Sequence, residues 1–383
     1  MGVKLQLPSA AQMPDGGRVS TKEALGPLSV KQAPCYEQRQ PSNAQDAQDA
    51  EALLAARTTT ALLESETTPA GKRHLVLPLP QFDPSRYEFR RVLMKDLRNG
   101  GCIELFEETG SGLLLAAKRL QKDWVLESPE AFRQANPLLL ESPWQELEMC
   151  LRLGSPSSVD RVSRANLCHG AFREPNGDIL LMSEYSPGGD LFDIVTRCRE
   201  EPGAVEREQK IWPVIVSLLR AVQSLHELGV AHGDISLENA LLGSDGEVRL
   251  IDFEAAVSEN PSQTRGTRGK PSYQPPEMHT APSFDACSGD LFACGVCAYV
   301  LAVGDYPWSG TRPGSCRGFD FFQRKGLESF LAHRRVRNLD GTKGKAVGEI
   351  LSPELRQLLV LLLDPLDPVM RYEALKTLPC ERS

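Results

Sequence analysis

The chain has 383 residues, 41% of them hydrophobic and 25% charged, which is enough to bury the core of one large domain or two medium ones. Its formal net charge is −8 at pH 7, and this acidic balance argues against nucleic acid or an anionic membrane as the main partner. Composition therefore indicates a globular protein and says nothing further about its fold.

Ten cysteines are scattered along the chain, and only Cys294 and Cys297 lie close together. Both fall inside an apolar segment, so we expect buried small side chains rather than a metal or redox site. Such a pattern is typical of a reducing compartment. No apolar run follows Met1, and no apolar stretch elsewhere reaches about 18 residues without a charge. The sequence thus predicts a cytoplasmic protein without a secretory signal or a membrane span.

The first 80 residues differ in composition from the rest of the chain. They are rich in Ala, Gln, Pro, Ser and Thr and contain few aromatic residues, so residues 1–80 are predicted to be a disordered tail. From Tyr87 onward, short runs of strand-forming residues predict an antiparallel sheet interrupted by one helix. The predicted strands are 89–94, 103–107 and 113–120, and the predicted helix is 144–153.

Helical patterns dominate after Gly188. The predicted helices are 212–228, 291–303 and 353–363. A small half rich in strands followed by a larger helical half predicts an α+β fold with two lobes.

The segment from His232 to Asn239 carries the strongest chemical signal. Asp234 is followed five residues later by Asn239, and Asp252 comes thirteen residues after that, behind a short apolar stretch. One carboxylate that can act as a base and two oxygen ligands for magnesium are what phosphoryl transfer needs, because that reaction depends on positioning and charge neutralisation.

With H-G-D at 232–234 in place of H-R-D and D-F-E at 252–254 in place of D-F-G, the chain resembles the eukaryotic protein kinase superfamily. The resemblance covers residues 87–378 and implies an N-lobe at 87–184 and a C-lobe at 185–378. It also implies that ATP and Mg²⁺ are the cofactors and that the γ-phosphoryl group passes to Ser or Thr hydroxyls of a protein substrate.

The resemblance assigns roles within the catalytic loop. Asp234 would accept the hydrogen bond of the substrate hydroxyl, and Asn239 and Asp252 would hold magnesium through oxygen atoms. His232 and Phe253 would be packing residues that join the two lobes.

The ATP-binding residues implied by the resemblance lie upstream. Lys118 ends an apolar strand that also contains Ala116, and it would hold the ATP phosphates as a point charge. Its partner would be Glu146, which shares a predicted helical face with three apolar residues, with Glu148 as the competing choice. The adenine would meet the backbone at Glu184 and Tyr185, in a segment similar to the hinge between kinase lobes.

Further resemblances concern architecture. Residues 269–277 look like the end of an activation segment, where a peptide substrate would dock, and Glu277 would form a buried ion pair with Arg371. Asp290 would cap a central helix and tie down the catalytic loop.

Several positions depart from the family pattern. Counting back from Lys118 places residues 98–105 over the phosphates, and only Gly100 falls where the family has one of its three glycines. Glycine at 233 replaces an arginine, and Glu254 replaces a glycine next to the metal ligands. Ser236 stands where Ser/Thr kinases carry a lysine.

Lys270 stands where those kinases carry a threonine that faces this lysine. The lysine and the hydroxyl residue of the family pattern have thus exchanged positions. We hypothesise that Lys270 supplies the missing positive charge from the opposite side of the cleft.

Three functions remain open from the sequence. The leading one is an active protein Ser/Thr kinase, because Lys118, Glu146, Asp234, Asn239 and Asp252 are all present. The second is a pseudokinase that binds nucleotide or acts as a scaffold, which the poor glycine loop and Glu254 favour. The third, a small-molecule kinase, is disfavoured by the peptide-docking character of 269–277. The sequence does not define the physiological substrate or the oligomeric state.

Overall fold

The computed structural model describes residues 66–67, 73–74, 79–95, 101–154, 168–198, 203–337 and 342–379. Most of the predicted tail, residues 1–80, lies outside this set. Within the tail, the short strands β1 (Glu66–Thr67) and β2 (Arg73–His74) pair with each other in antiparallel fashion. Gly100 also lies outside the described residues.

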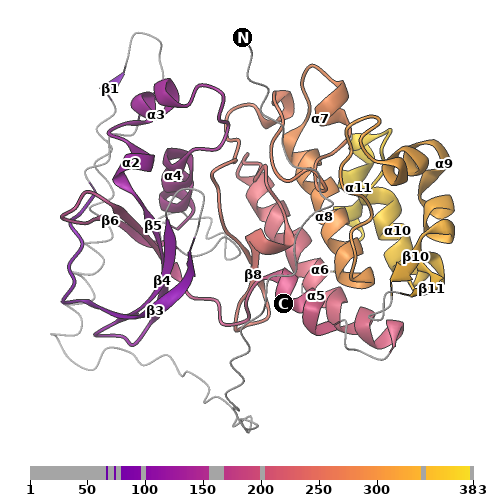
Figure 1. The fold of residues 1–383 in the computed structure, drawn as a ribbon, viewed down its shortest axis with the longest axis horizontal. Helices are drawn as coiled ribbons and strands as arrows, with labels where there is room; N and C mark the ends of the chain where they lie inside the picture. The colour runs from indigo at the N-terminus through magenta and orange to yellow at the C-terminus, as the bar shows by residue number, and fades with distance from the viewer. Residues whose placement is uncertain are drawn as a thin grey trace, which may run out of the picture. The chain divides into compact units, whose positions relative to one another are not determined.

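A five-stranded antiparallel sheet forms the N-terminal half, in the order β3-β4-β5-β7-β6 (Figure 1). The bounds are Tyr87–Lys95 for β3, Cys102–Glu108 for β4, Leu114–Leu120 for β5, Cys168–Arg173 for β6 and Ile179–Glu184 for β7. Leu115 and Ala117 of β5 are buried while Ala116 between them is only partly buried, because side chains on successive strand residues point to opposite faces of the sheet. The three predicted strands agree with β3, β4 and β5 to within two residues at each end.

Helix α4 (Pro143–Gly154) packs against this sheet and is the predicted helix of the N-lobe. Its apolar face consists of Leu147, Cys150 and Leu153, which are all buried. Two short helices, α2 (Lys122–Val125) and α3 (Pro129–Ala135), precede it and were not predicted. They are only four and seven residues long, which is too short for a clear helical period in the sequence.

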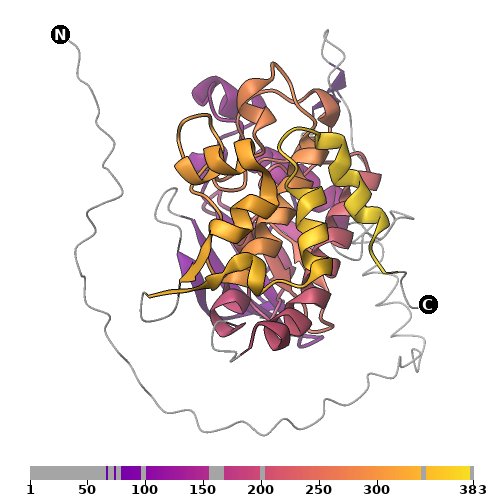
Figure 2. The same ribbon diagram turned by 90° about the vertical axis from the view of Figure 1, so that its right-hand side faces the viewer.

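Helices make up most of the C-terminal half (Figures 1 and 2). Their bounds are Leu191–Cys198 for α5, Ala204–Glu227 for α6, Glu277–Thr280 for α7, Ala286–Val303 for α8, Arg317–His333 for α9, Pro353–Leu362 for α10 and Arg371–Lys376 for α11. Short strand pairs join them, namely β8 (Ala240–Leu242) with β9 (Val248–Leu250) and β10 (Arg335–Arg337) with β11 (Lys343–Ala346). The structure therefore has the two-lobed α+β architecture that the sequence predicts.

Helix α6 begins eight residues before the predicted start at 212, because its first two turns are rich in Glu, Arg and Lys and carry little apolar signal. Helix α8 contacts α5, α6 and α10, and every one of its residues is buried. Within the described residues it is the helix long and apolar enough to cross a membrane, and here its apolar surface instead forms the centre of the C-lobe.

The prediction that Asp290 caps the central helix is wrong. The residue at the N-cap of α8 is Asp285, whose side chain accepts a hydrogen bond from the Cys287 backbone N–H at 3.1 Å. Asp290 lies one turn inside the helix and is buried. Its carboxylate accepts hydrogen bonds from the backbone N–H groups of His232 (2.7 Å) and Gly233 (2.9 Å), so it does contact the catalytic loop as expected.

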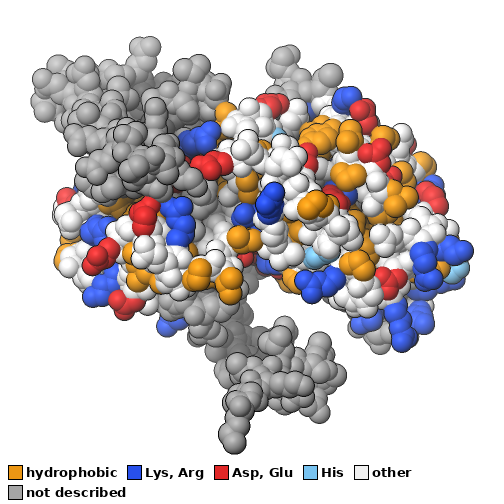
Figure 3. Space-filling view, turned by 90° about the horizontal axis from the view of Figure 1, so that it is seen from above, with side chains coloured by type: hydrophobic (Ala, Val, Ile, Leu, Met, Phe, Trp, Pro, Cys, Tyr) orange, Lys and Arg blue, Asp and Glu red, His pale blue; other side chains and the backbone are white. Residues whose placement is uncertain are grey.

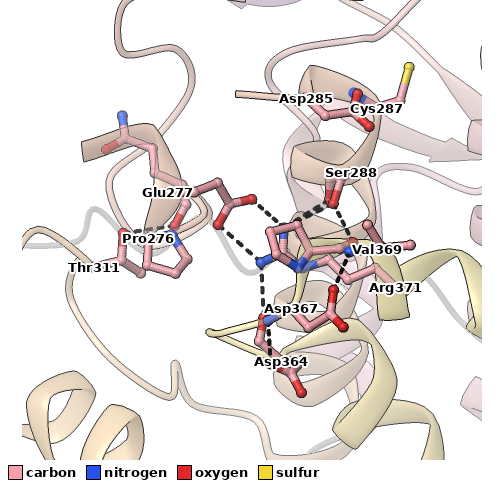
Figure 4. A network of polar contacts seen from close by, with 12 residues as sticks. Pro276, Glu277, Asp285, Cys287, Ser288, Thr311, Asp364, Asp367, Val369 and Arg371 are labelled. Carbon is pink, nitrogen blue, oxygen red and sulfur yellow. Dashed lines mark hydrogen bonds and ion pairs between the residues drawn. The ribbon is translucent and has the colours of Figure 1, made fainter. Parts of the chain in front are cut away.

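Arg371 and Glu277 form the buried ion pair that the resemblance implies (Figure 4). The Arg371 side chain is fully buried, and its Nη2 lies 3.1 Å from Glu277 Oε2. The guanidinium also donates to the backbone oxygen of Asp364 at 2.9 Å and to Ser288 Oγ at 3.2 Å. This one side chain thus joins α7, α8 and the segment after α10, and places the end of residues 269–277 on the C-lobe core.

Candidate active site

The catalytic loop brings Asp234 and Asn239 together. Asn239 Nδ2 donates to Asp234 Oδ2 and to the Asp234 backbone oxygen, each at 2.9 Å. The other carboxylate oxygen, Oδ1, accepts the Lys270 backbone N–H at 3.2 Å. Asp234 is half-buried, and this burial raises the pKa of its carboxyl. The carboxylate is thereby held in one orientation by donors from both the loop and residues 269–277.

The structure explains the glycine at position 233. Gly233 has φ = 79°, and a Cβ atom there would lie 2.4 Å from the backbone oxygen of Ala255. No other residue fits without a shift of the backbone, so the arginine of the family pattern is excluded. Arg268 contacts the same carbonyl instead, with its Nη1 donating to Ala255 O at 3.2 Å. Sequence reasoning did not single out Arg268.

Lys118 lies among three carboxylates. Its Nζ is 2.7 Å from Glu146 Oε2, 3.3 Å from Asp252 Oδ1 and 3.1 Å from Glu254 Oε1. Strand β5 supplies the lysine and helix α4 supplies Glu146, while Glu148 is exposed on the other side of α4. The competing choice of Glu148 is thus not the partner in the structure.

Burial and the charges of this cluster act in opposite directions on its pKa values. Burial lowers the pKa of Lys118, but the nearby carboxylates, Glu146 first, outweigh burial and raise it well above its usual value. Burial raises the pKa of the Glu146 carboxyl, and the neighbouring Lys118 ammonium opposes this rise. The ammonium is therefore held in its charged form.

Glu254 is the part of this cluster that sequence reasoning left undecided. The sequence showed a negative charge near the metal ligands but not what it contacts, because Glu254 meets a residue 136 positions away. Carboxylate oxygens of Glu146, Asp252 and Glu254 lie within 4.8 Å of one another, which is close enough to hold a metal ion. Lys118 Nζ is hydrogen-bonded to all three, so the cation of this cluster is the lysine ammonium.

Asp252 and Asn239 are the residues that suit a magnesium ion. The Asp252 carboxylate is 41% exposed, and its backbone has φ = 66°, a left-handed conformation that costs a non-glycine residue about 1–3 kcal/mol. Both partners of Asn239 Nδ2 are acceptors, so the amide nitrogen must face them and the amide oxygen faces the other way. A carboxylate and an amide oxygen are donors that Mg²⁺ prefers, and the pair fits that ion.

Lys270 points toward the catalytic loop. Its Nζ donates to Ser236 Oγ at 2.8 Å and lies 3.0 Å from Glu238 Oε2. Burial raises the pKa of Glu238, but hydrogen bonds, with Lys270 foremost, outweigh burial and lower it. Ser236 and Lys270 are therefore in direct contact, and Glu238 is a partner that the sequence did not indicate.

The hinge residues lie beside the strand that carries Lys118. Strand β7 ends at Glu184, and the Tyr185 backbone N–H donates to Leu114 O at 3.0 Å. Ser183 is the register partner of Ala116 across β5 and β7. The structure thus places Ala116 and the hinge side by side.

His232 and Phe253 form a buried contact beneath the site. Their ring centroids are 5.0 Å apart, and His232 Nε2 is hydrogen-bonded to the Ile251 backbone oxygen at 2.9 Å. Both residues are almost completely buried, so they act as packing residues between the catalytic loop and the segment with Asp252.

The sequence of this chain is similar to known protein kinases. The family model described as "Protein kinase domain" matches residues 101–378. Citron Rho-interacting kinase of Mus musculus is 32% identical over 261 residues, which are 65% of this chain and 12% of that protein. CBL-interacting protein kinase 31 of Oryza sativa subsp. japonica is 33% identical over 137 residues, which are 34% of this chain and 29% of that protein. The chain thus covers less than a third of the length of either relative.

Proposed function

The chain belongs to the protein kinase family, and from this premise we propose that it is an active enzyme that transfers the γ-phosphoryl group of ATP to Ser or Thr hydroxyls of proteins. The observation that carries the proposal is the 2.7 Å ion pair between Lys118 and Glu146, formed across the sheet and α4. Phosphoryl transfer requires this ion pair together with an oriented Asp234 and Asn239, whereas a protein that acts only as a scaffold does not require them. The names of the relatives, which include a CBL-interacting serine/threonine-protein kinase of Arabidopsis thaliana, support Ser/Thr specificity.

In the proposed mechanism Asp234 accepts the proton of the substrate hydroxyl as that oxygen attacks the γ-phosphorus, while the bond from the γ-phosphorus to the bridging oxygen breaks and ADP leaves. The Asn239 amide and the Lys270 backbone N–H hold its carboxylate in place. Lys118, oriented by Glu146, binds the ATP phosphates, and the backbone at Glu184 and Tyr185 binds adenine. Asn239 and Asp252 would hold Mg²⁺, and that ion would supply neutralisation of the phosphate charge.

The pseudokinase reading keeps one specific observation in its favour. Glu254 forms a third ion pair with Lys118, which competes with phosphate for the lysine charge.

The free thiols of the described cysteines support the proposal that the protein works in a reducing, intracellular compartment, whichever of the two functions holds.

The test measures the melting temperature of the purified chain with ATP and Mg²⁺, with ATP and EDTA, and without ligand, alongside ³²P transfer to itself and to a basic protein. A ligand that binds the folded state raises the melting temperature by mass action. We expect a shift and transfer that both require Mg²⁺. A shift without transfer would support the pseudokinase, and the absence of both would overturn ATP binding.

Lys270 is proposed as a third catalytic residue, because it lies 2.8 Å from the serine that replaces the usual lysine. Loss of one charged hydrogen bond to the transferred phosphoryl group costs about 1.5–3 kcal/mol, or roughly 10- to 160-fold in rate. We expect that decrease in kcat for Lys270→Ala, measured with saturating ATP. Lys122→Ala, at an exposed lysine, is the control. If Lys270→Ala kept full turnover while Lys118→Met abolished it, the exchange hypothesis would be wrong.

A further inference from the structure

An open pocket of about 440 Å³ lies beside the residues proposed to dock a peptide. Ser272, from residues 269–277, forms one wall, and residues between Asp305 and Gly318 form another. The wall is attached to the docking residues, because Trp308 Nε1 donates to Ser272 O at 3.1 Å and Thr311 Oγ1 donates to Gln274 O at 2.8 Å. The pocket is thus next to residues 269–277, which also contact Asp234 through the Lys270 backbone N–H.

A short hydrogen-bond chain connects this pocket to the catalytic loop. Tyr306, which lines the pocket, has its hydroxyl 3.0 Å from the hydroxyl of Tyr273. The Tyr273 hydroxyl accepts the backbone N–H of Leu237 at 3.4 Å, between Asp234 and Asn239. Hydrogen bonds therefore connect this wall of the pocket to the loop that carries Asp234 and Asn239.

Two arginines line the pocket, and their charges are not equally compensated. Arg334 Nη2 lies 3.1 Å from Asp305 Oδ2 and also donates to the Tyr306 backbone oxygen at 2.9 Å. Arg337, on β10, is exposed, and no carboxylate of the described residues forms an ion pair with it. One positive charge at the pocket is thus left without a partner in the described part of the chain.

The surface around the pocket is basic although the whole chain is acidic. Residues 317–349 contain eight basic residues (Lys and Arg) and four acidic residues (Asp and Glu), so their formal charge is positive. The formal net charge of the whole chain is −8. Figure 3 shows Lys and Arg side chains gathered at one edge of the molecule, at the horizontal position that α9 and the β10–β11 pair occupy in Figure 1. Those that are exposed in this region are Arg317, Arg324, Lys325, Arg335, Arg337, Lys343 and Lys345.

We propose that this pocket binds the carboxylate of an acidic residue in the protein substrate, a few residues from the phosphoacceptor, with Arg337 as its charge partner. The inference rests on the proposed function, since it assumes that a peptide docks along 269–277. A single uncompensated arginine matches the single charge of a carboxylate, whereas a phosphate dianion would need a second free cation. The surrounding basic surface would favour an acidic stretch over a basic one.

The test compares fluorescein-labelled serine peptides that carry Glu at successive positions on either side of the serine with a peptide that carries Gln instead. Binding to the full chain is measured by fluorescence anisotropy without ATP, so the result does not depend on phosphoryl transfer. We expect one Glu position to tighten binding roughly three- to tenfold over Gln. Equal affinities for every Glu peptide and the Gln peptide would overturn the proposal.

The variants are Arg337→Gln and, as a matched control on the same strand, Arg335→Gln, which removes the same charge outside the pocket lining. Arg337→Gln should abolish the preference for Glu, and Arg335→Gln should change it less than twofold. Equal losses in both variants would mean that only the general basic surface acts. If a peptide with phosphoserine at that position bound more than tenfold more tightly than the Glu peptide, the ligand of the pocket would be a phosphate and the carboxylate proposal would be overturned.

A second readout uses the wild-type protein. Cys316 lines the pocket and is partly accessible, whereas Cys102 is a partly accessible cysteine of the N-terminal sheet. Alkylation by iodoacetamide is measured by mass spectrometry of the digested chain. The preferred Glu peptide should slow the alkylation of Cys316 and leave the rate of alkylation at Cys102 unchanged. Unchanged alkylation of Cys316 at saturating peptide would place the peptide elsewhere and overturn the assignment of the pocket.

Discussion

Replacing Asp234 with Asn should lower phosphoryl transfer by about 10²- to 10⁴-fold, the usual contribution of a positioned base. The substitution keeps the size of the side chain but removes the acceptor that takes the substrate proton. Asn at this position can still accept the Lys270 backbone N–H, but its amide nitrogen then faces the Asn239 Nδ2 donor, so the hydrogen bond from Asn239 to the side chain is lost. The hydrogen bond from Asn239 to the backbone oxygen of residue 234 remains, so we expect the fold and the Mg-ATP-dependent shift in melting temperature to be kept. Transfer is measured as kcat/KM for a protein substrate, and nucleotide binding by the shift in melting temperature.

The control for this prediction is Asp123→Asn, because Asp123 is an exposed aspartate at the start of α2, far along the chain from the catalytic loop. It should leave kcat/KM unchanged. Retention of more than about a tenth of wild-type transfer in the Asp234 variant would contradict its role as the base. Loss of the nucleotide-dependent shift together with transfer would indicate a folding defect instead.

Replacing Arg371 with Ala should destabilise the protein by about 3–5 kcal/mol, because it leaves the Glu277 carboxylate without its buried partner. The Arg371 guanidinium also donates hydrogen bonds to Ser288 Oγ and to the Asp364 carbonyl (Figure 4). It lies 5.0 Å from the centre of the Phe292 ring. The free energy of unfolding is measured by urea titration followed by tryptophan fluorescence.

Lys376→Ala is the matched control on the same helix, because Lys376 pairs with Glu373 at an exposed site. An exposed pair of this kind contributes about 0–1 kcal/mol. The double variant Arg371→Met with Glu277→Gln removes both charges and should be more stable than Arg371→Ala. If Arg371→Ala cost no more than Lys376→Ala, the buried pair would not be what holds residues 269–277 on the C-lobe core.

The residues proposed for catalysis could be predicted because their chemistry is concentrated in short segments. Asp234 and Asn239 belong to one loop, and their separation of five residues is enough for a hydrogen bond within that loop. The choice of Glu146 over Glu148 also came from local information, because the apolar period of 144–153 shows which side of the helix is buried.

Other contacts could not be predicted because they join distant parts of the chain. The sequence showed that Glu254 replaces a glycine, but only the packing of β5 against the segment after Asp252 brings it to Lys118. The role of Asp290 was mistaken in part for the same reason. An aspartate near the start of an apolar helix resembles a cap, whereas its partners are backbone N–H groups 57 and 58 positions upstream.

The sequence by itself determined the family resemblance, the order of the two lobes and the identity of the residues proposed for catalysis, since these depend on periodicity and on motifs within a few residues. The tertiary structure decided why position 233 is glycine, which carboxylates surround Lys118 and that Arg337 lines a pocket beside residues 269–277. Each of these depends on the approach of a backbone carbonyl or a charge from a remote segment. Local sequence patterns do not encode such distances, because the packing of the whole core sets them.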